Sequence, residues 1–196
     1  MANRSEAVIL EAEDRYRAGD YGASVLALAP LVESPRPDAR ALCITGLCRL
    51  RQGDAGEALR LLHHAHRLAP LDASIRLHLG IGLQANGRHR EAMPHFKECQ
   101  RALPSDPAPF LNLASSALVL GEPGEARRAA RRARVRAPQL PQAHYVLGQI
   151  ELARAQDVAA EMAFVRATQL APNFIDAWVN LGVARYRNGA LEGAKV

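Results

Sequence analysis

Small and apolar residues recur along the chain with a period of 34 residues, and this pattern predicts paired helices. One column of small residues contains Ala12, Gly46, Gly80, Ala114, Gly148 and Gly182. A second contains Gly19, Gly53, Gly87, Gly121, Ala155 and Gly189, and a third contains Ser24, Ala58, Ala92, Ala126, Ala160 and Ala194. A fourth contains Pro70, Pro104, Pro138 and Pro172. Each unit is therefore predicted to be a helix, a glycine turn and a second helix that ends before proline.

Polar residues and prolines at fixed places predict where the first helices begin. Asp38, Asp72 and Asp106 are also spaced by 34 residues and are expected to be N-caps. Pro107 and Pro141 are expected to open later first helices, where proline is tolerated.

The repeat resembles the tetratricopeptide repeat family over nearly the whole chain. The most similar unit combines Trp178, Leu181, Gly182, Gly189 and Ala194, and the unit before it supplies Ala160, Phe164, Ala167 and Pro172. The resemblance implies an all-α, right-handed α-solenoid of about 5.5 helix–turn–helix repeats. The expected repeats are residues 5–38, 39–72, 73–106, 107–140, 141–174 and an incomplete 175–196 of one solenoid over 1–196. It also implies a protein- or peptide-binding scaffold without catalytic residues or cofactors.

The two ends of the pattern differ. The first unit carries Glu11 and Arg15 where apolar residues are usual, which is typical of a capping repeat. The last unit leaves Trp178, Leu181 and Val183 on a helix whose partner has only begun. We therefore expect an N-terminal recognition arm of a longer protein. The alternative is a complete short chain that self-associates through this open edge.

In this family the first helices line the inner, concave surface. One stripe of each first helix, such as Arg76, Gly80 and Leu83, is expected to face the second helix of its own repeat. The stripe beginning one residue later is expected to face inward, and it is mostly apolar. The candidate peptide-binding residues are Cys43, Leu47, Leu77, His78, Ile81, Leu111, Asn112, Ser115, Tyr145, Gln149 and Asn180. Two interpretations remain open: a groove for an amphipathic helix or extended peptide, or a seam where first helices pack.

Two binding modes known in the family can be compared with this stripe. The Lys/Asn/Arg clamp for chaperone tails is absent, because Cys43 and Leu77 occupy its lysine column and Leu47 its asparagine column. The asparagine ladder of relatives fused to sugar transferases is represented only by Asn112 and Asn180. A second hypothesis is therefore the non-catalytic, substrate-presenting region of a bacterial glycosyltransferase or sulfotransferase.

Charge adds one candidate surface. The net charge is +5, and one second helix concentrates arginine, with Arg127, Arg128, Arg131 and Arg132 as the candidate contacts for an anionic partner. Like charges at i, i+4 repel, so something is expected to offset them. The alternative is a solvated arginine-rich helix. No aromatic residue is interleaved for base stacking, which disfavours nucleic acid.

The remaining chemistry-bearing residues predict no metal site and no redox site. His63, His64 and His66 share a helix but lack a further ligand at suitable spacing. Cys43, Cys48 and Cys99 form no CxxC and are expected to be small packing residues in a reducing compartment. The N-terminus lacks the apolar core of a signal peptide, and no window is apolar enough to span a membrane. We therefore expect a cytoplasmic location.

Overall fold

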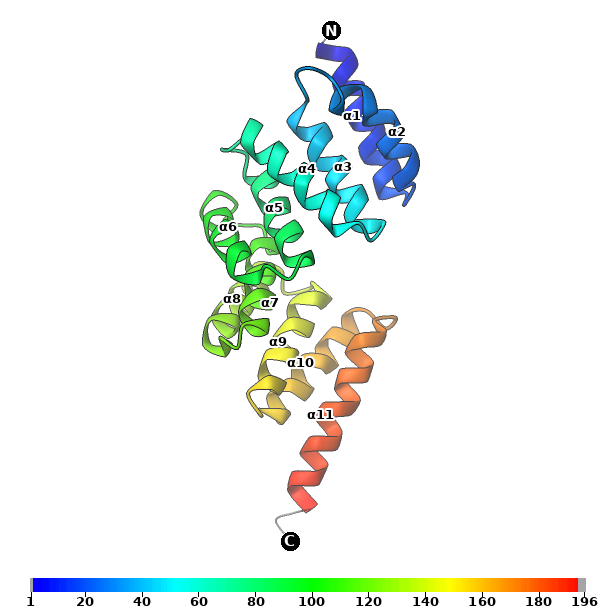
Figure 1. The fold of residues 1–196 in the computed structure, drawn as a ribbon. Helices are drawn as coiled ribbons and strands as arrows, with labels where there is room; N and C mark the ends of the chain where they lie inside the picture. Colours follow the sequence, from blue (N-terminus) through cyan, green and yellow to red (C-terminus); the bar gives the residue numbers. More distant parts are fainter. Residues whose placement is uncertain (1, 194–196) are drawn as a thin grey trace. The chain divides into compact units, whose positions relative to one another are not determined.

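The computed structural model describes residues 2–193, and over these residues it consists of helices and turns (Figure 1). Six helices lie in the N-terminal half: α1 (Ala2–Arg17), α2 (Tyr21–Val32), α3 (Ala39–Arg51), α4 (Ala55–Leu68), α5 (Ala73–Ala85) and α6 (His89–Ala102). Five follow: α7 (Ala108–Val119), α8 (Pro123–Arg136), α9 (Pro141–Ala153), α10 (Asp157–Leu170) and α11 (Ile175–Gly193). The all-α repeat architecture predicted from the 34-residue period is thus confirmed.

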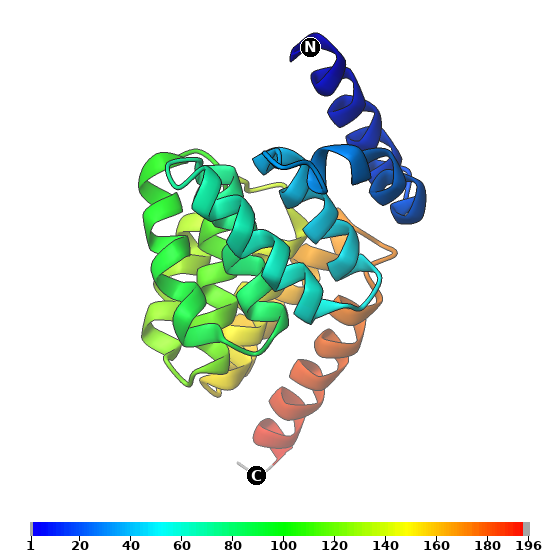
Figure 2. The same cartoon turned by 45° about the horizontal axis from the view of Figure 1, so that its top comes forward.

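The helices fall into two compact units, which we describe separately. Unit 1 ends at Cys99 and unit 2 begins at Gln100. In unit 1, consecutive helices from α1 to α5 pack against each other, and the chain can be followed through them by its colours in Figure 2. The first helices α1, α3 and α5 also contact in sequence. In unit 2, consecutive helices from α7 to α11 pack in the same way, with contacts between α7, α9 and α11. In each unit the first helices therefore lie side by side along one face, which we call the inner face, and we call the face formed by the second helices the outer face.

The first small-residue column marks where the helices of a pair approach most closely. A Cβ atom added at Gly80 would lie 2.5 Å from Cε1 of Phe96, and one added at Gly148 would lie 2.6 Å from Cε1 of Phe164. At Gly46 the corresponding distance is 2.9 Å to Cγ of Leu62. These distances are too short for a side chain, so glycine lets a large apolar residue of the second helix sit against the backbone of the first.

The second column forms the turns as predicted, with one exception. Gly19, Gly53, Gly87 and Gly121 adopt φ between +71° and +86°, and Ala155 adopts φ of +55°. Gly189 was predicted to form the same turn, but α11 continues through it to Gly193. The prediction was wrong because ending the helix here would break backbone hydrogen bonds, and among the described residues no helix after α11 packs on it in compensation. Ala194, predicted to begin the next packing column, lies outside the described residues.

The predicted helix starts are mostly confirmed. The carboxylates of Asp38 and Asp72 accept backbone hydrogen bonds as N-caps of α3 and α5. Pro141 opens α9 as expected, whereas Pro107 is itself the N-cap residue of α7. Asp106 lies one residue earlier, and its carboxylate accepts from the backbone N–H of Ala108 at 2.8 Å.

We expect Gly80→Ala to destabilise the protein by about 1–3 kcal/mol, because the new methyl group would overlap the Phe96 ring. Gly182→Ala is a matched control from the same column, since a Cβ there meets nothing within 4 Å. That control should be neutral or stabilising by up to about 1 kcal/mol through helix propensity. Urea unfolding measures both, and equal effects of the two substitutions would contradict the close-packing explanation.

Candidate functional site

The inner face of unit 1 contains a cavity of ≈ 480 Å³ that spans three successive first helices. Helices α1, α3 and α5 each contribute part of its wall. Its lining residues are Glu13, Tyr16, Arg17, Arg40, Cys43, Ile44, Leu47, Asp72, Ser74, Ile75 and His78. A volume of this size is typical of a site that holds a small molecule or several side chains of a peptide.

The floor of the cavity is apolar except for one polar contact. Ile44 and Ile75 are 7% and 3% exposed, and Leu47 is half-buried. Cys43 is also buried, and its Sγ lies 3.3 Å from Nδ1 of His78. The floor therefore joins adjacent first helices through both apolar packing and a thiol–imidazole contact.

The thiol and the imidazole are both neutral. Burial raises the pKa of Cys43 to about 12, and the nearby carboxylates of Asp72 and Glu13 act in the same direction. Burial also lowers the pKa of His78 below its usual value of 6.5, against a smaller opposing effect of Asp72. The contact therefore joins a neutral thiol to a neutral imidazole. A thiolate–imidazolium pair, which an activated cysteine nucleophile needs, does not form at neutral pH.

The rim of the cavity carries both signs of charge. The guanidinium of Arg40 donates to Glu6 and to Glu13, each at 2.8 Å, and so links α3 to α1. Arg17 pairs with Glu13 and with Asp14 on its own helix. The Asp72 carboxylate accepts from the backbone of α5 as its N-cap. These exposed pairs contribute little stability, and a ligand can compete for them.

The predicted groove residues in unit 1 fall into two groups. Cys43, Leu47 and His78 line the cavity, whereas Leu77 is buried and Ile81 is half-buried, and neither lines it. The rim residues are polar and were not predicted, because the groove was inferred from the apolar stripe of each first helix. The signal that could have found them is the position of Arg40 and Asp72 at helix starts in adjacent repeats.

Three of the predicted groove residues of unit 2 form a polar cluster on its inner face. Gln149 donates to the Tyr145 hydroxyl at 3.0 Å, and Asn180 donates to it at 3.3 Å, so that α9 and α11 are joined. Burial raises the pKa of Tyr145. Leu111 and Ser115 lie half-buried on α7.

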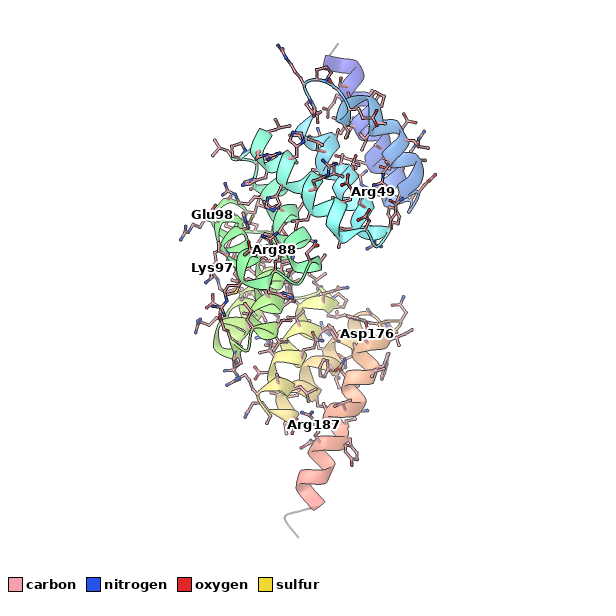
Figure 3. The ribbon with its side chains drawn as sticks, viewed as in Figure 1. Arg49, Arg88, Lys97, Glu98, Asp176 and Arg187 are labelled. Carbon is pink, nitrogen blue, oxygen red and sulfur yellow. The ribbon has the colours of Figure 1, made fainter. Side chains whose placement is uncertain are left out.

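The two asparagines of the predicted ladder are both engaged by their own helices. The amide of Asn112 donates to the carbonyl of Ala108, and that of Asn180 donates to the carbonyl of Asp176 (labelled in Figure 3). Their N–H groups therefore serve local structure, and nothing in this geometry favours a peptide ladder over side chains that stabilise their own helices.

Two arginines of the arginine-rich helix α8 are ion-paired. The carboxylate of Glu151, only 4% exposed, accepts from both Arg127 and Arg154 at 2.6 Å. Arg128 pairs with Glu125 on the same helix.

Two further arginines of this helix stack on a buried ring. The guanidinium carbons of Arg132 and Arg136 lie 4.7 Å and 3.9 Å from the centroid of Phe110. Together, these ion pairs and ring contacts offset the repulsion that was expected between arginines spaced i, i+4. Of the four predicted anion contacts, Arg131 alone has no such contact among the described residues.

The histidines and cysteines give no metal or disulfide geometry within the described residues. His66 meets the ring of His95 edge-on at 5.8 Å, and no group of three His, Cys, Asp or Glu side chains there could hold a metal ion. Cys43, Cys48 and Cys99 are all buried free thiols. No helix over residues 2–193 is both long enough and apolar enough to cross a membrane.

The buried imidazole of His78 predicts a pH-dependent stability. Its pKa in the folded protein lies below 6.5, so near pH 6 the unfolded chain binds more protons than the folded chain. The contribution of neutral His78 to the free energy of unfolding is therefore present above about pH 6.5. It falls as the pH decreases, by at most ~1.4 kcal/mol per pH unit for one histidine. Urea midpoints from about pH 7 to about pH 5 should decline less steeply in His78→Gln. Equal slopes would contradict the assignment.

Comparisons with known proteins agree with this architecture. No curated protein sequence matches the chain. A thermophilic TPR protein of Thermus thermophilus superposes with a TM-score of 0.76 and 18% identity, over 93% of this chain and 99% of its own. MamA from Desulfovibrio magneticus gives a TM-score of 0.73 and 16% identity, over 87% of this chain and 96% of its own. A chain of the APC/C hetero-tetramer Cut9–Hcn1 gives a TM-score of 0.81 and 18% identity, and the superposition covers 92% of this chain but 36% of that one.

At such low identity, these likenesses establish the fold alone. The family assignment comes from sequence: the tetratricopeptide repeat model matches residues 9–62, 49–107 and 111–173. These matches cover most of the chain and overlap helix pairs of both units. The chain therefore belongs to the tetratricopeptide repeat family.

Proposed function

We propose that this repeat scaffold binds an extended peptide segment of a partner protein through the inner-face cavity of unit 1. The observation that carries the proposal is the cavity itself, which crosses α1, α3 and α5 and joins an apolar floor to a charged rim. Tetratricopeptide repeats are typically non-catalytic scaffolds that bind proteins or peptides. The proposal adds the place on this chain and the kind of segment bound.

The floor selects the side chain that would enter. Ile44, Leu47 and Ile75 present aliphatic surface, and the neutral Cys43–His78 pair adds no charge. An aliphatic side chain entering here loses contact with water without leaving a buried charge unpaired. The bound segment therefore presents an apolar anchor to the floor.

The rim suits the peptide backbone and its polar flanks. Arg17 and Arg40 offer N–H donors, and Glu13 and Asp72 offer acceptor oxygens, around the same opening. An extended backbone has both donors and acceptors free, so it can use both kinds of group. Since the cysteine–histidine pair is neutral, we propose binding without covalent chemistry.

The test is a selection of random dodecapeptides displayed on phage against the immobilised full chain. We expect enriched peptides to share an aliphatic anchor, and we expect Leu47→Arg to weaken their binding about tenfold or more, because it places a charge over the apolar floor. Leu71→Arg is the matched control, since Leu71 is 92% exposed and does not line the cavity. Circular dichroism melting checks that both variants fold.

If the enriched peptides bind Leu47→Arg and Leu71→Arg equally well, the assignment of peptide binding to this cavity is refuted. So would a selection whose peptides share only charged residues, since the apolar floor would then have no part in binding. Isothermal titration of the enriched peptides gives the affinities in both cases.

A second candidate function, self-association, is favoured by one observation on unit 2. Helix α11 presents exposed apolar side chains at Ile175, Trp178, Val179, Val183 and Tyr186. Figure 3 labels Asp176 and Arg187, which lie toward the two ends of this stretch. Exposed apolar groups in a row are typical of a contact surface. Light scattering at tens of micromolar that reports only monomer would exclude this candidate.

A further inference from the structure

The outer face of unit 2 contains a second hollow that is separate from the proposed peptide site. It has a volume of ≈ 300 Å³ and lies between α8 and α10, with α9 beneath it. Helix α8 contributes Arg127, Arg131 and Arg134 to its wall, and α10 contributes Met162 and Arg166.

The hollow has an excess of positive charge. The one carboxylate in its lining is Glu151, which is already shared by Arg127 and by Arg154 outside the hollow. Within residues 2–193, the one side chain to which Arg166 donates is the neutral Gln139. Arg131 and Arg134 are exposed and have no ion-pair partner among the described residues. Two guanidinium groups are therefore available to an incoming anion.

The fold does not require arginine at these positions, as unit 1 shows. Its outer face has a hollow of ≈ 200 Å³ between α2 and α4, three 34-residue repeats earlier in the sequence. The residues in register with Arg127, Arg131 and Arg134 are Val25, Ala29 and Val32, and all three line that hollow. At these three positions, therefore, α2 contributes aliphatic residues where α8 contributes arginine. The rest of the unit 1 lining contains equal numbers of arginines and glutamates, namely Arg49, Arg60, Glu33 and Glu57.

The arginines also carry an energetic cost that a bound anion would remove. Arg127 and Arg131 are spaced i, i+4, and Arg131 and Arg134 are spaced i, i+3, so neighbouring charges repel. Glu151 offsets this repulsion at Arg127 only. A ligand carrying carboxylates would offset it at the other two positions.

The remaining lining identifies the class of ligand. Leu147 and Ala163 form a buried apolar base, while the Met162 side chain is 70% exposed at the edge. No Phe, Tyr or Trp lies in this lining, and the nearby Phe110 ring is buried beneath Arg132 and Arg136. The hollow therefore lacks the Phe, Tyr or Trp rings on which single-stranded nucleic-acid bases usually stack. It suits an anionic chain that also has aliphatic side chains.

We infer that this outer hollow is a docking site for an acidic segment of a partner protein. Carboxylates of the segment pair with Arg131 and Arg134, and an aliphatic side chain of the segment packs on Met162 and Leu147. Because the site shares no residue with the cavity of unit 1, either one can fail its test without affecting the other.

The experiment measures fluorescence anisotropy of a labelled peptide, Glu-Asp-Leu-Glu-Glu-Leu-Asp-Glu, titrated with the full chain at about 0.05 M salt. The test variant is Arg131→Ala with Arg134→Val, which installs the residues that unit 1 carries in register. The control variant is Arg36→Ala with Arg90→Ala, which removes the same charge from two exposed arginines elsewhere. We expect the test variant to weaken binding about tenfold or more and the control to stay within about twofold.

Three results would overturn the inference. The first is an equal loss of affinity in both variants, which would mean that net charge alone attracts the peptide. The second is no binding by the unmodified chain. The third is a single-stranded oligonucleotide of the same charge that binds more tightly and loses affinity in the same test variant, which would assign the hollow to nucleic acid.

Discussion

The structure depends on one close contact, made where a first helix crosses the second helix of its own repeat. Gly80 against Phe96 and Gly148 against Phe164 leave no room for a Cβ atom, so each ring lies directly on the neighbouring backbone. Both rings are completely buried. This contact fixes the separation of the two helices and, with the left-handed turn residue between them, fixes which side of the first helix faces inward.

Once the helix pair is fixed, the two faces of each unit are free to differ in chemistry. The inner face of unit 1 becomes a cavity because Cys43, Ile44 and Ile75 pack against their neighbours while Leu47 stays partly open. At the corresponding face of unit 2, Tyr145 gathers Gln149 and Asn180 into a hydrogen-bonded cluster. One scaffold therefore presents an apolar floor in one unit and a polar cluster in the other.

The arginine-rich helix shows why charge along a sequence is a poor measure of charge offered to a partner. Arg127 is paired with Glu151, Arg128 is paired with Glu125, and Arg132 lies over the Phe110 ring. Burying Glu151 is possible because two guanidinium groups share its carboxylate. The surface that remains cationic is smaller than the sequence suggests and is displaced toward Arg131 and Arg134.

The sequence by itself determined the helix pairs, their turns and most of their caps. These features depend on local backbone preferences: Asp38 caps its own helix, and Gly53 adopts a positive φ within its own turn. Tertiary structure decided which inward residues are buried, such as Leu77, and which remain open, such as Leu47. It also decided the Cys43–His78 contact and the sharing of Glu151. These join side chains on different helices, whose meeting depends on how neighbouring helices pack, and a periodic pattern within each repeat does not specify that. At Gly189 even the local signal was overruled, because among the described residues no helix after α11 packs on it to favour the turn over a continuous helix.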